Sequence, residues 1–254
     1  MGNGAAALRD VELAGPEAGA ATQGELVAYV AHELRAPLAS IKAYTEILLD
    51  DAEPESQRAA FLATINQEAD YLTGLIDSLL NVARIESGQL RLHATDVDLP
   101  ALLAAVQPAF APPLAARELA WAVTIAEGVP ALRGDPDLLA ILLRNLLANA
   151  VAHNRRGGRV IVELAPAPGG GVRLTVGDEG AGIPEEERER IFEKFYRVAA
   201  PSGDGARGSG LGLYLVRWIA ALHGGTATVE STGSAGSRFA VTLRDAPPDD
   251  AWES

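Results

Sequence analysis

A histidine and a carboxylate stand side by side near the start of the chain, in the segment His32-Glu33-Leu34-Arg35-Ala36-Pro37-Leu38. On a helix with about 100° per residue, seven apolar residues share roughly a third of the circumference, and His32 points to the opposite side; these residues are Leu26, Val30, Leu34, Leu38, Ile41, Tyr44 and Leu48. An exposed neutral imidazole is a nucleophile near neutral pH, and the Glu33 carboxylate is placed to accept the proton of the second ring nitrogen. The pair predicts a nucleophilic histidine, although a single exposed His-Glu pair also fits an ordinary helix surface.

Two clusters farther along have the groups that a metal ion and a flat ligand require. Asn145 and Asn149 are four residues apart on an apolar helix, so their amides share one face, and amide oxygens suit Mg²⁺. Asp178 follows a predicted strand and can accept a hydrogen bond from an exocyclic amine, while Gly180 and Gly182 let the backbone approach a flat ligand. Taken alone, the amides also fit buried hydrogen-bonding struts, and the glycines fit a tight turn.

Two further clusters supply cations and a glycine-rich helix start. The segment Phe192-Glu193-Lys194-Phe195-Tyr196-Arg197 is aromatic-rich and ends in a cation that can reach a terminal phosphate, although aromatics at this spacing are also typical of a core. The segment Gly208-Ser209-Gly210-Leu211-Gly212-Leu213 opens a helix, where free N–H groups and the positive end of the dipole favour phosphates. No Lys-Ser or Lys-Thr follows these glycines, so the segment is not a Walker A loop.

Regular elements must hold these groups in place. The 3.6-residue spacing of apolar residues predicts a helix over about residues 25–49, which Pro37 should bend just after His32, and a second long helix that ends near Ser87. A short polar turn joins the two into an antiparallel hairpin. Because a lone hairpin leaves both apolar stripes half exposed, we expect two copies to form a four-helix bundle, and so a homodimer. Packing of the hairpin on the chain's own second domain is the alternative.

After about residue 98 the sequence changes to mixed helix and strand. Helices are expected over about residues 100–115, 136–152 and 211–222, and strands near 119–125, 159–164, 171–176, 226–230 and 237–243. Helices on one face of a mixed, largely antiparallel sheet form an α/β sandwich. The long irregular stretch 177–210 predicts a functional loop, with a short acidic helix near Pro184.

The composition limits the class of protein. A formal net charge of −13 argues against nucleic acid and anionic membranes as partners, and the absence of cysteine excludes disulfides and thiolate metal sites. No apolar run reaches the roughly 20 residues that cross a bilayer, so we expect no membrane segment and a cytoplasmic protein. The expected organisation is a flexible segment 1–22, a hairpin domain 23–89, a linker 90–98, an α/β domain 99–245 and a flexible tail 246–254.

In the order of five segments, the sequence resembles the sensor histidine kinases of two-component signalling. The segments are the His-Glu pair, the asparagine pair, the Asp178 segment with the first glycines, the aromatic segment 192–197 and the second glycine segment 208–213. The match covers about residues 25–245. It implies a dimerisation and histidine-phosphotransfer hairpin joined to a Bergerat-type ATP-binding domain of the kind shared with gyrase, Hsp90 and MutL. It also implies an ATP- and Mg²⁺-dependent kinase that phosphorylates its own histidine and passes the phosphoryl group to an aspartate of a response regulator.

The resemblance implies roles for individual residues. His32 is then the phosphoacceptor with Glu33 as its base, Asn149 is the Mg²⁺ ligand with Asn145 close by, and Asp178 reads adenine. The remaining nucleotide-binding residues that it implies are Gly180, Gly182, Lys194, Arg197, Gly208, Gly210, Leu211 and Gly212.

The sequence departs from the family pattern at two places. Kinases of this family usually carry a basic residue three positions after the metal-binding asparagine, where this chain has Ala152 followed by His153. They usually carry Thr or Asn four positions after the phosphoacceptor, a residue implicated in dephosphorylating the partner, where this chain has Ala36. A weakly active or inactive nucleotide-binding scaffold is therefore a second hypothesis, and an ATP-hydrolysing clamp of the gyrase or Hsp90 type is a third. The other histidines, His93, His153 and His223, are expected to be surface or capping residues.

Overall fold

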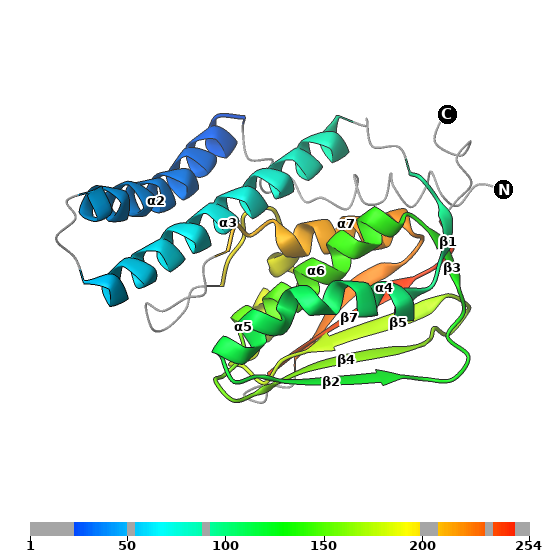
Figure 1. Cartoon of the computed structure of the whole chain (residues 1–254). Coiled ribbons are helices and arrows are strands. Elements are labelled where there is room, and N and C mark those ends of the chain that lie inside the picture. Colours follow the sequence, from blue (N-terminus) through cyan, green and yellow to red (C-terminus); the bar gives the residue numbers. More distant parts are fainter. Residues whose placement is uncertain (1–22, 50–53, 88–91, 199–207, 232–235, 247–254) are drawn as a thin grey trace. The chain divides into compact units, whose positions relative to one another are not determined.

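The computed structural model describes residues 23–49, 54–87, 92–198, 208–231 and 236–246 (Figure 1). The chain forms two compact units that divide after residue 88, a helical hairpin and a mixed α/β domain, and each is described by itself. The expectations for the N-terminal segment 1–22, for residues 247–254 of the tail and for the start of the linker lie outside the described residues.

The hairpin consists of two long helices, as predicted. Helix α2 spans Gln23–Leu49 and helix α3 spans Glu55–Glu86. The rings of Tyr44 and Phe61 stack between them with their centroids 5.1 Å apart. Helix α2 continues without interruption through Pro37, which is buried and has no N–H to donate to the Glu33 carbonyl. The proline therefore removes a hydrogen bond from α2 without ending it.

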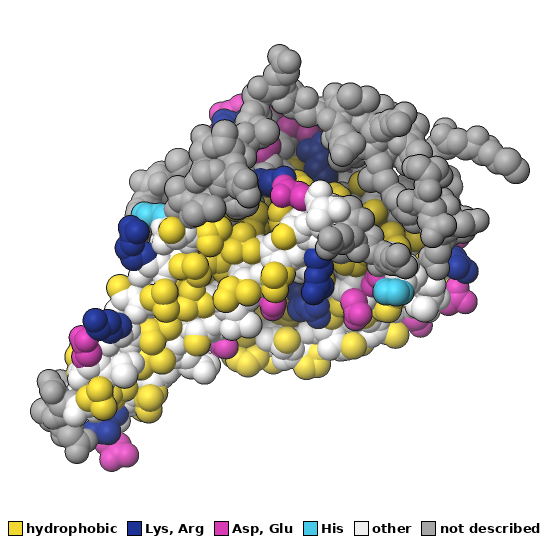
Figure 2. Space-filling model, turned by 90° about the horizontal axis from the view of Figure 1, so that it is seen from above, with side chains coloured by type: hydrophobic (Ala, Val, Ile, Leu, Met, Phe, Trp, Pro, Cys, Tyr) yellow, Lys and Arg dark blue, Asp and Glu magenta, His cyan; other side chains and the backbone are white. Residues whose placement is uncertain are grey.

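The apolar stripe of the hairpin is not fully covered. Leu38, which the helical spacing assigns to the inward face, is 53% exposed. Other large apolar side chains of the two helices are also exposed to solvent: Ile47, Leu49, Leu62, Ile76 and Leu80. Figure 2 shows apolar side chains along the exposed face of the hairpin. The hairpin alone thus leaves a large amount of apolar surface in contact with water.

The α/β domain is built on a five-stranded sheet with the order β2-β4-β5-β7-β6. Its strands are β2 (Ala120–Ile125), β4 (Arg159–Pro166), β5 (Val172–Gly177), β6 (Thr226–Ser231) and β7 (Ser237–Leu243). Strand β2 pairs with β4 in parallel and the other pairs are antiparallel, as expected for a mixed, largely antiparallel sheet. The register aligns buried residues in rows across one face, such as Val162, Val176 and Phe239.

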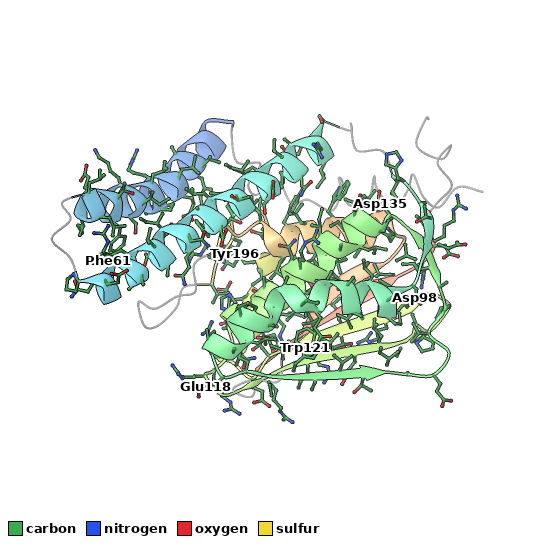
Figure 3. All side chains as sticks on the ribbon, in the orientation of Figure 1. Phe61, Asp98, Glu118, Trp121, Asp135 and Tyr196 are labelled. Atoms are coloured by element: carbon green, nitrogen blue, oxygen red, sulfur yellow. The ribbon has the colours of Figure 1, made fainter. Side chains whose placement is uncertain are left out.

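Helices cover that face of the sheet, which confirms the α/β sandwich (Figure 1). The helices are α4 (Leu99–Val106), α5 (Ala111–Ala116), α6 (Pro136–Ala152) and α7 (Gly212–Leu222), and the 3₁₀ turn η1 (Gln107–Phe110), which contains a proline, lies between α4 and α5. Asp98 and Asp135 cap α4 and α6, because their carboxylates accept hydrogen bonds from the first-turn N–H groups (Figure 3). Helix α6 is the central helix, with nine buried apolar residues.

The sequence did not predict a second, two-stranded sheet. Strand β1 (Thr95–Val97) lies inside the expected linker and pairs with β3 (Leu132–Gly134). Three residues are too few to show a period of two, so no pattern marked either strand. The expected acidic helix near Pro184 is only the 3₁₀ turn η2 (Glu185–Glu187), followed by η3 (Arg190–Phe192). Ala246, expected in the flexible tail, is buried, and its N–H donates to the Arg133 carbonyl at 2.7 Å.

One helical stretch among the described residues, Leu99–Ala116, is long and apolar enough to cross a membrane by length and composition alone. It comprises α4, η1 and α5, and several of its apolar side chains are buried in the α/β domain: Leu99, Leu103, Val106, Phe110 and Leu114. Its hydrophobicity therefore has a structural explanation within the core of the domain.

His223 joins the end of α7 to the start of α6. The ring is completely buried; Nε2 accepts a hydrogen bond from the Asp135 N–H at 3.1 Å, and Nδ1 lies 2.8 Å from the Ile219 carbonyl oxygen, to which it donates in this tautomer. A Cβ at position 134 would lie 2.8 Å from the ring, so Gly134 makes room for it. Burial lowers the pKa of His223, while the Ile219 carbonyl and the Asp135 carboxylate raise it. His223 caps α7 as expected, but it is a core residue and not a surface one.

The hydrogen bonds of the buried His223 ring predict that the stability of the α/β domain depends on pH. Because the pKa of His223 is lower in the folded chain than its ordinary value of 6.5, the stabilisation is present above pH 6.5 and is lost as the pH falls below it. We expect His223→Leu to reduce the free energy of unfolding at pH 7.5 by about 1–3 kcal/mol, because it leaves the buried N–H of Asp135 unpaired, whereas the Ile219 carbonyl keeps the backbone N–H of residue 223. The variant should also lose less stability between pH 7.5 and 5.5 than the unmodified chain.

Denaturant unfolding followed by tryptophan fluorescence measures this domain selectively, because Trp121, Trp218 and Trp252 all lie after residue 98. His93→Leu is the matched control, since His93 is exposed. An equal pH dependence in the His223→Leu variant and the unmodified chain would contradict the assignment.

Candidate functional site

The His-Glu pair lies on α2 with the exposure that the sequence predicts. His32 is exposed and Glu33 is half-buried. The phenol of Tyr71 in α3 donates a hydrogen bond to Oε2 of Glu33 at 2.8 Å. Ala36 is exposed one helical turn beyond His32. The hairpin therefore presents an imidazole to solvent and holds the neighbouring carboxylate through the second helix.

Asp178 is a buried carboxylate with one oxygen satisfied and the other unpaired. It follows β5 and is 5% exposed. Its Oδ1 accepts hydrogen bonds from the backbone N–H groups of Gly180 at 2.8 Å and Ser237 at 3.3 Å, whereas Oδ2 is buried and has no partner. Burial raises the pKa of Asp178, and the bonds from Gly180 and Ser237 lower it. Such an unpaired buried oxygen is costly unless a ligand donor completes it.

The backbone around Asp178 packs too closely for side chains. A Cβ at Gly180 would lie 1.9 Å from the carbonyl oxygen of His153, and one at Gly236 would lie 1.9 Å from the carbonyl oxygen of Asp178. Gly182 has a φ of +77°, in the region that other residues rarely adopt. Gly180 and Gly182 thus occupy positions that need glycine, and Gly236 is a third that the sequence did not single out.

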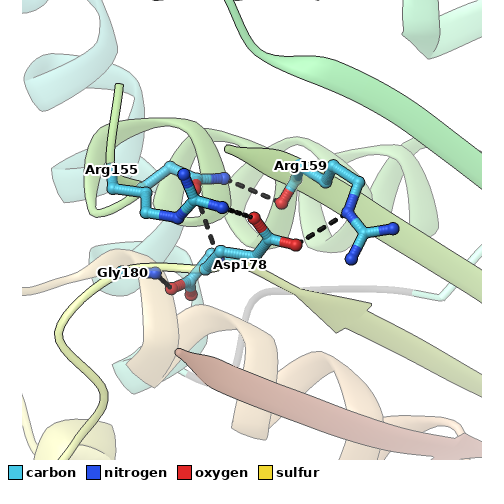
Figure 4. A network of polar contacts seen from close by, with 6 residues as sticks. Arg155, Arg159, Asp178 and Gly180 are labelled. Atoms are coloured by element: carbon cyan, nitrogen blue, oxygen red, sulfur yellow. Dashed lines mark hydrogen bonds and ion pairs between the residues drawn. The ribbon is translucent and has the colours of Figure 1, made fainter. Parts of the chain in front are cut away.

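A polar network fixes the Asp178 loop to the end of α6 (Figure 4). Asn154, which is 5% exposed, accepts the Glu179 N–H through Oδ1 at 3.2 Å and donates to the Arg159 carbonyl at 2.9 Å. The Glu179 carboxylate pairs with Arg155 at 2.5 Å and with Arg159 at 2.7 Å. These two arginines lower the pKa of Glu179. Sequence reasoning missed Asn154, although it stands only five positions after Asn149.

The two asparagines of α6 lie half-buried on one face, as their spacing predicts. The Asn145 amide donates to the Ile141 carbonyl at 2.9 Å, and its Oδ1 lies 2.7 Å from where a Cβ at Gly212 would stand. Asn145 therefore lies against the start of α7. Within the described residues the Asn149 amide group makes no hydrogen bond, which leaves its oxygen available for a metal ion. Those residues contain no group of three or more His, Asp or Glu side chains that could hold a metal without other ligands.

The aromatic segment and the second glycine segment meet through their backbones. The Phe195 N–H donates to the Gly210 carbonyl at 3.0 Å, and a Cβ at Gly210 would lie 2.6 Å from the Phe195 carbonyl carbon. Both residues have positive φ, 63° for Phe195 and 65° for Gly210. This conformation is uncommon for a residue with a side chain, so the contact constrains the backbone where the stretch between the two segments begins and ends. Residues 199–207 of that stretch lie outside the described residues.

Lys194 of the aromatic segment and Arg190, which precedes that segment, lie over aromatic rings. Lys194 Nζ is 5.0 Å from the centroid of the Tyr214 ring in α7, and the Arg190 guanidinium is 4.2 Å from that of Tyr196. At the second glycine segment, Leu211 is fully buried at the start of α7. Among the described residues other than the neighbours of Gly208 in the chain, no atom lies within 4 Å of where a Cβ at Gly208 would stand.

Positive charge is present near the position where the family usually has a cation. Ala152 offers none, but the pKa of His153 is lowered, first by loss of surrounding water and then by the charges of Arg117 and Arg197. Arg117 is bound to the end of α6, where it donates to the carbonyl oxygens of Val151 and Ala152 at 3.0 and 2.7 Å. The charge of Arg197, in the aromatic segment, thus contributes to the lowered pKa of His153, the residue that follows α6.

Family models match both units of the chain. Residues 22–88 match the His Kinase A (phospho-acceptor) domain, and residues 134–247 match the histidine kinase-, DNA gyrase B- and HSP90-like ATPase. The alginate biosynthesis sensor protein KinB of Pseudomonas aeruginosa is 34% identical over 223 residues, which cover 87% of this chain and 37% of KinB. The chain belongs to the sensor histidine kinases.

Other comparisons agree with this assignment. The sensor-like histidine kinase SenX3 of Mycobacterium tuberculosis is 32% identical over 225 residues, which cover 88% of this sensor kinase and 54% of SenX3. The crystal structure of full-length ShkA in complex with AMPPNP has a TM-score of 0.61 and 28% identity, and the match covers 88% of this kinase and 47% of ShkA. The kinase thus spans between about a third and about half of the length of these relatives.

The geometry at Asp178 predicts a specific loss of nucleotide affinity. In Asp178→Asn the amide oxygen can keep the bonds from Gly180 and Ser237, which turns the NH₂ group toward the space now faced by Oδ2. Two donors then face each other when adenine binds, so we expect ADP affinity to fall by about 1.5–3 kcal/mol, or roughly 10- to 150-fold. Because no carboxylate is then buried, the stability of the free domain should not decrease.

Isothermal calorimetry with Mg²⁺ and ADP measures this change, and thermal unfolding without nucleotide measures the stability. Asp96→Asn, at an exposed position on β1, is the matched control. Unchanged ADP affinity in Asp178→Asn would rule out this pocket as the adenine site.

Proposed function

We propose that this kinase transfers the γ-phosphoryl group of ATP to His32 and then passes it to an aspartate of a response regulator. The main support for ATP binding is the buried Oδ2 of Asp178, which is a hydrogen-bond acceptor without a partner. It lies in a loop where glycines let neighbouring backbone segments pack closely. The observation that supports the acceptor part is the exposed imidazole of His32 beside Glu33, in the unit that matches a phospho-acceptor domain.

Each residue has a defined role in this proposal. Asp178 accepts a hydrogen bond from the 6-amino group of adenine, and Arg197 faces the negatively charged phosphates. As one ring nitrogen of His32 bonds to the γ-phosphorus, the bond from that phosphorus to the β,γ-bridging oxygen breaks and ADP leaves with its electron pair. Glu33 accepts the proton from the other ring nitrogen. The free amide oxygen of Asn149 would hold a Mg²⁺ ion, which neutralises phosphate charge when bound.

The rival interpretation as a non-catalytic scaffold rests on Ala152. Two observations support a working phosphate end despite Ala152: the charge of Arg197 contributes to the lowered pKa of His153, and the Asn149 amide is unengaged within the described residues. An ATP-hydrolysing clamp would have no use for an exposed His-Glu pair on a bundle helix. The phosphotransfer kinase therefore accounts for more of the observed side chains than either rival.

The acceptor assignment predicts a separation between labelling and binding. We expect His32→Gln to abolish the acid-labile, base-stable phosphate formed from γ-labelled ATP. ADP affinity should change less than twofold, because His32 and Asp178 belong to different compact units. Undiminished labelling of His32→Gln would place the acceptor elsewhere, and a chain without any labelling would favour the scaffold.

We also propose that the hairpin forms a homodimer, because its exposed apolar side chains need a partner. Sedimentation of the full chain at micromolar concentration should give a dimer, and the double variant Leu62→Glu, Leu80→Glu should give a monomer. Val123→Glu is the matched control, since Val123 is an exposed apolar residue of the α/β domain. A monomeric unmodified chain would contradict this proposal.

A further inference from the structure

The hairpin contains a polar contact that the phosphotransfer scheme above does not use. The phenol of Tyr71 in α3 donates a hydrogen bond to Oε2 of Glu33 in α2, with the two oxygens 2.8 Å apart. The residues are 38 positions apart in the sequence, and both are half-buried. Because both belong to the same compact unit, the contact is internal to the hairpin.

Helix geometry explains why Glu33 needs such a contact. Neighbouring side chains on a helix diverge by about 100°, so His32 and Glu33 do not face each other by default. A glutamate has several rotatable bonds, and a half-exposed one samples many conformations. Only some of them bring the carboxylate toward the ring nitrogen of the preceding residue. A tether from the opposite helix reduces this freedom before the reaction begins.

The chemistry of the contact suits a base that must stay available. A hydroxyl that donates to an ionised carboxylate forms a charge-assisted hydrogen bond, which is shorter and stronger than a neutral one. The bond engages Oε2 alone. Within the described residues Oε1 of Glu33 has no hydrogen-bond partner, and an ionised carboxylate oxygen is an acceptor only. Tyr71 thus holds one oxygen and leaves the other free to accept a proton.

We propose that Tyr71 is a positioning residue for the phosphorylation of His32, an inference that rests on the proposed function. Tyr71 holds Glu33 so that Oε1 receives the proton from one ring nitrogen while the other nitrogen bonds to the γ-phosphorus of ATP. The phosphorus–oxygen bond to ADP breaks in the same step, and the Tyr71 O–H stays bonded to Oε2 throughout. Tyr71 itself exchanges neither proton nor phosphoryl group.

The test is Tyr71→Phe in the full chain, with autophosphorylation followed over a range of ATP concentrations. We expect kcat to fall roughly 10- to 100-fold, the scale of a misplaced general base, while the KM for ATP changes less than about twofold. A change in KM is not expected, because Tyr71 belongs to the hairpin and the nucleotide pocket to the other unit. Tyr44→Phe is the matched control: it removes a hydroxyl from the same hairpin and keeps the ring that stacks on Phe61.

A double-mutant cycle separates positioning from a general structural role. In the Glu33→Gln background no base remains to be positioned, so Tyr71→Phe should change the rate less than about twofold. Equal loss in both backgrounds, or a fall of the hairpin melting temperature that matches the loss of activity, would show that Tyr71 acts through folding and would overturn the proposal. So would a normal kcat in Tyr71→Phe.

The same experiment distinguishes this proposal from the proposed function. If the unmodified chain labels His32 and Glu33→Gln does not slow it, the kinase assignment stands and the positioning role of Tyr71 fails. If the unmodified chain forms no phosphohistidine at all, the proposed function fails and this proposal fails with it.

Discussion

The buried carboxylate of Asp178 is the constraint on which the nucleotide end of the molecule depends. Burial works against its charge, two backbone N–H groups compensate on one oxygen, and the second oxygen stays unpaired. The close backbone approach at Gly180 and Gly236 and the Asn154 network keep the loop in this shape. The free domain gives up some stability here, and a ligand with a donor at that position recovers it.

In each of the two units, a side chain from one helix forms a hydrogen bond that fixes a group on another helix. In the α/β domain the neutral His223 ring joins α7 to the start of α6, so the helix that carries Asn145 and Asn149 begins at a defined place. In the hairpin Tyr71 donates a hydrogen bond to Glu33, the residue that follows His32 in the sequence. Both contacts place a polar group before any ligand arrives, which is what pre-organisation for phosphoryl transfer requires.

The sequence predicted the elements whose apolar spacing is long and regular. Helices α2, α3, α6 and α7 and the strands β4 and β5 were expected within a few residues of their observed bounds. Strands β1 and β3 were missed, because three residues show no period, and the exposure of Leu38 could not be read from a helical projection alone. Motif order pointed to the asparagine, Asp178 and glycine segments. Tyr71, Asn154 and Ser237 were missed because their roles depend on which distant segments fold against them, and sequence spacing carries no such information.

The central claim is that Oδ2 of Asp178 accepts a hydrogen bond from the amino group of adenine. A comparison of the affinities for two nucleotides tests this claim most directly. Inosine triphosphate carries a carbonyl oxygen where ATP carries the amino group, so calorimetry in the presence of Mg²⁺ should show ATP binding at least about tenfold more tightly to the unmodified chain. In Asp178→Asn the preference should disappear or reverse, because the amide NH₂ can donate to that carbonyl. Equal affinity of the unmodified chain for the two nucleotides would contradict the account.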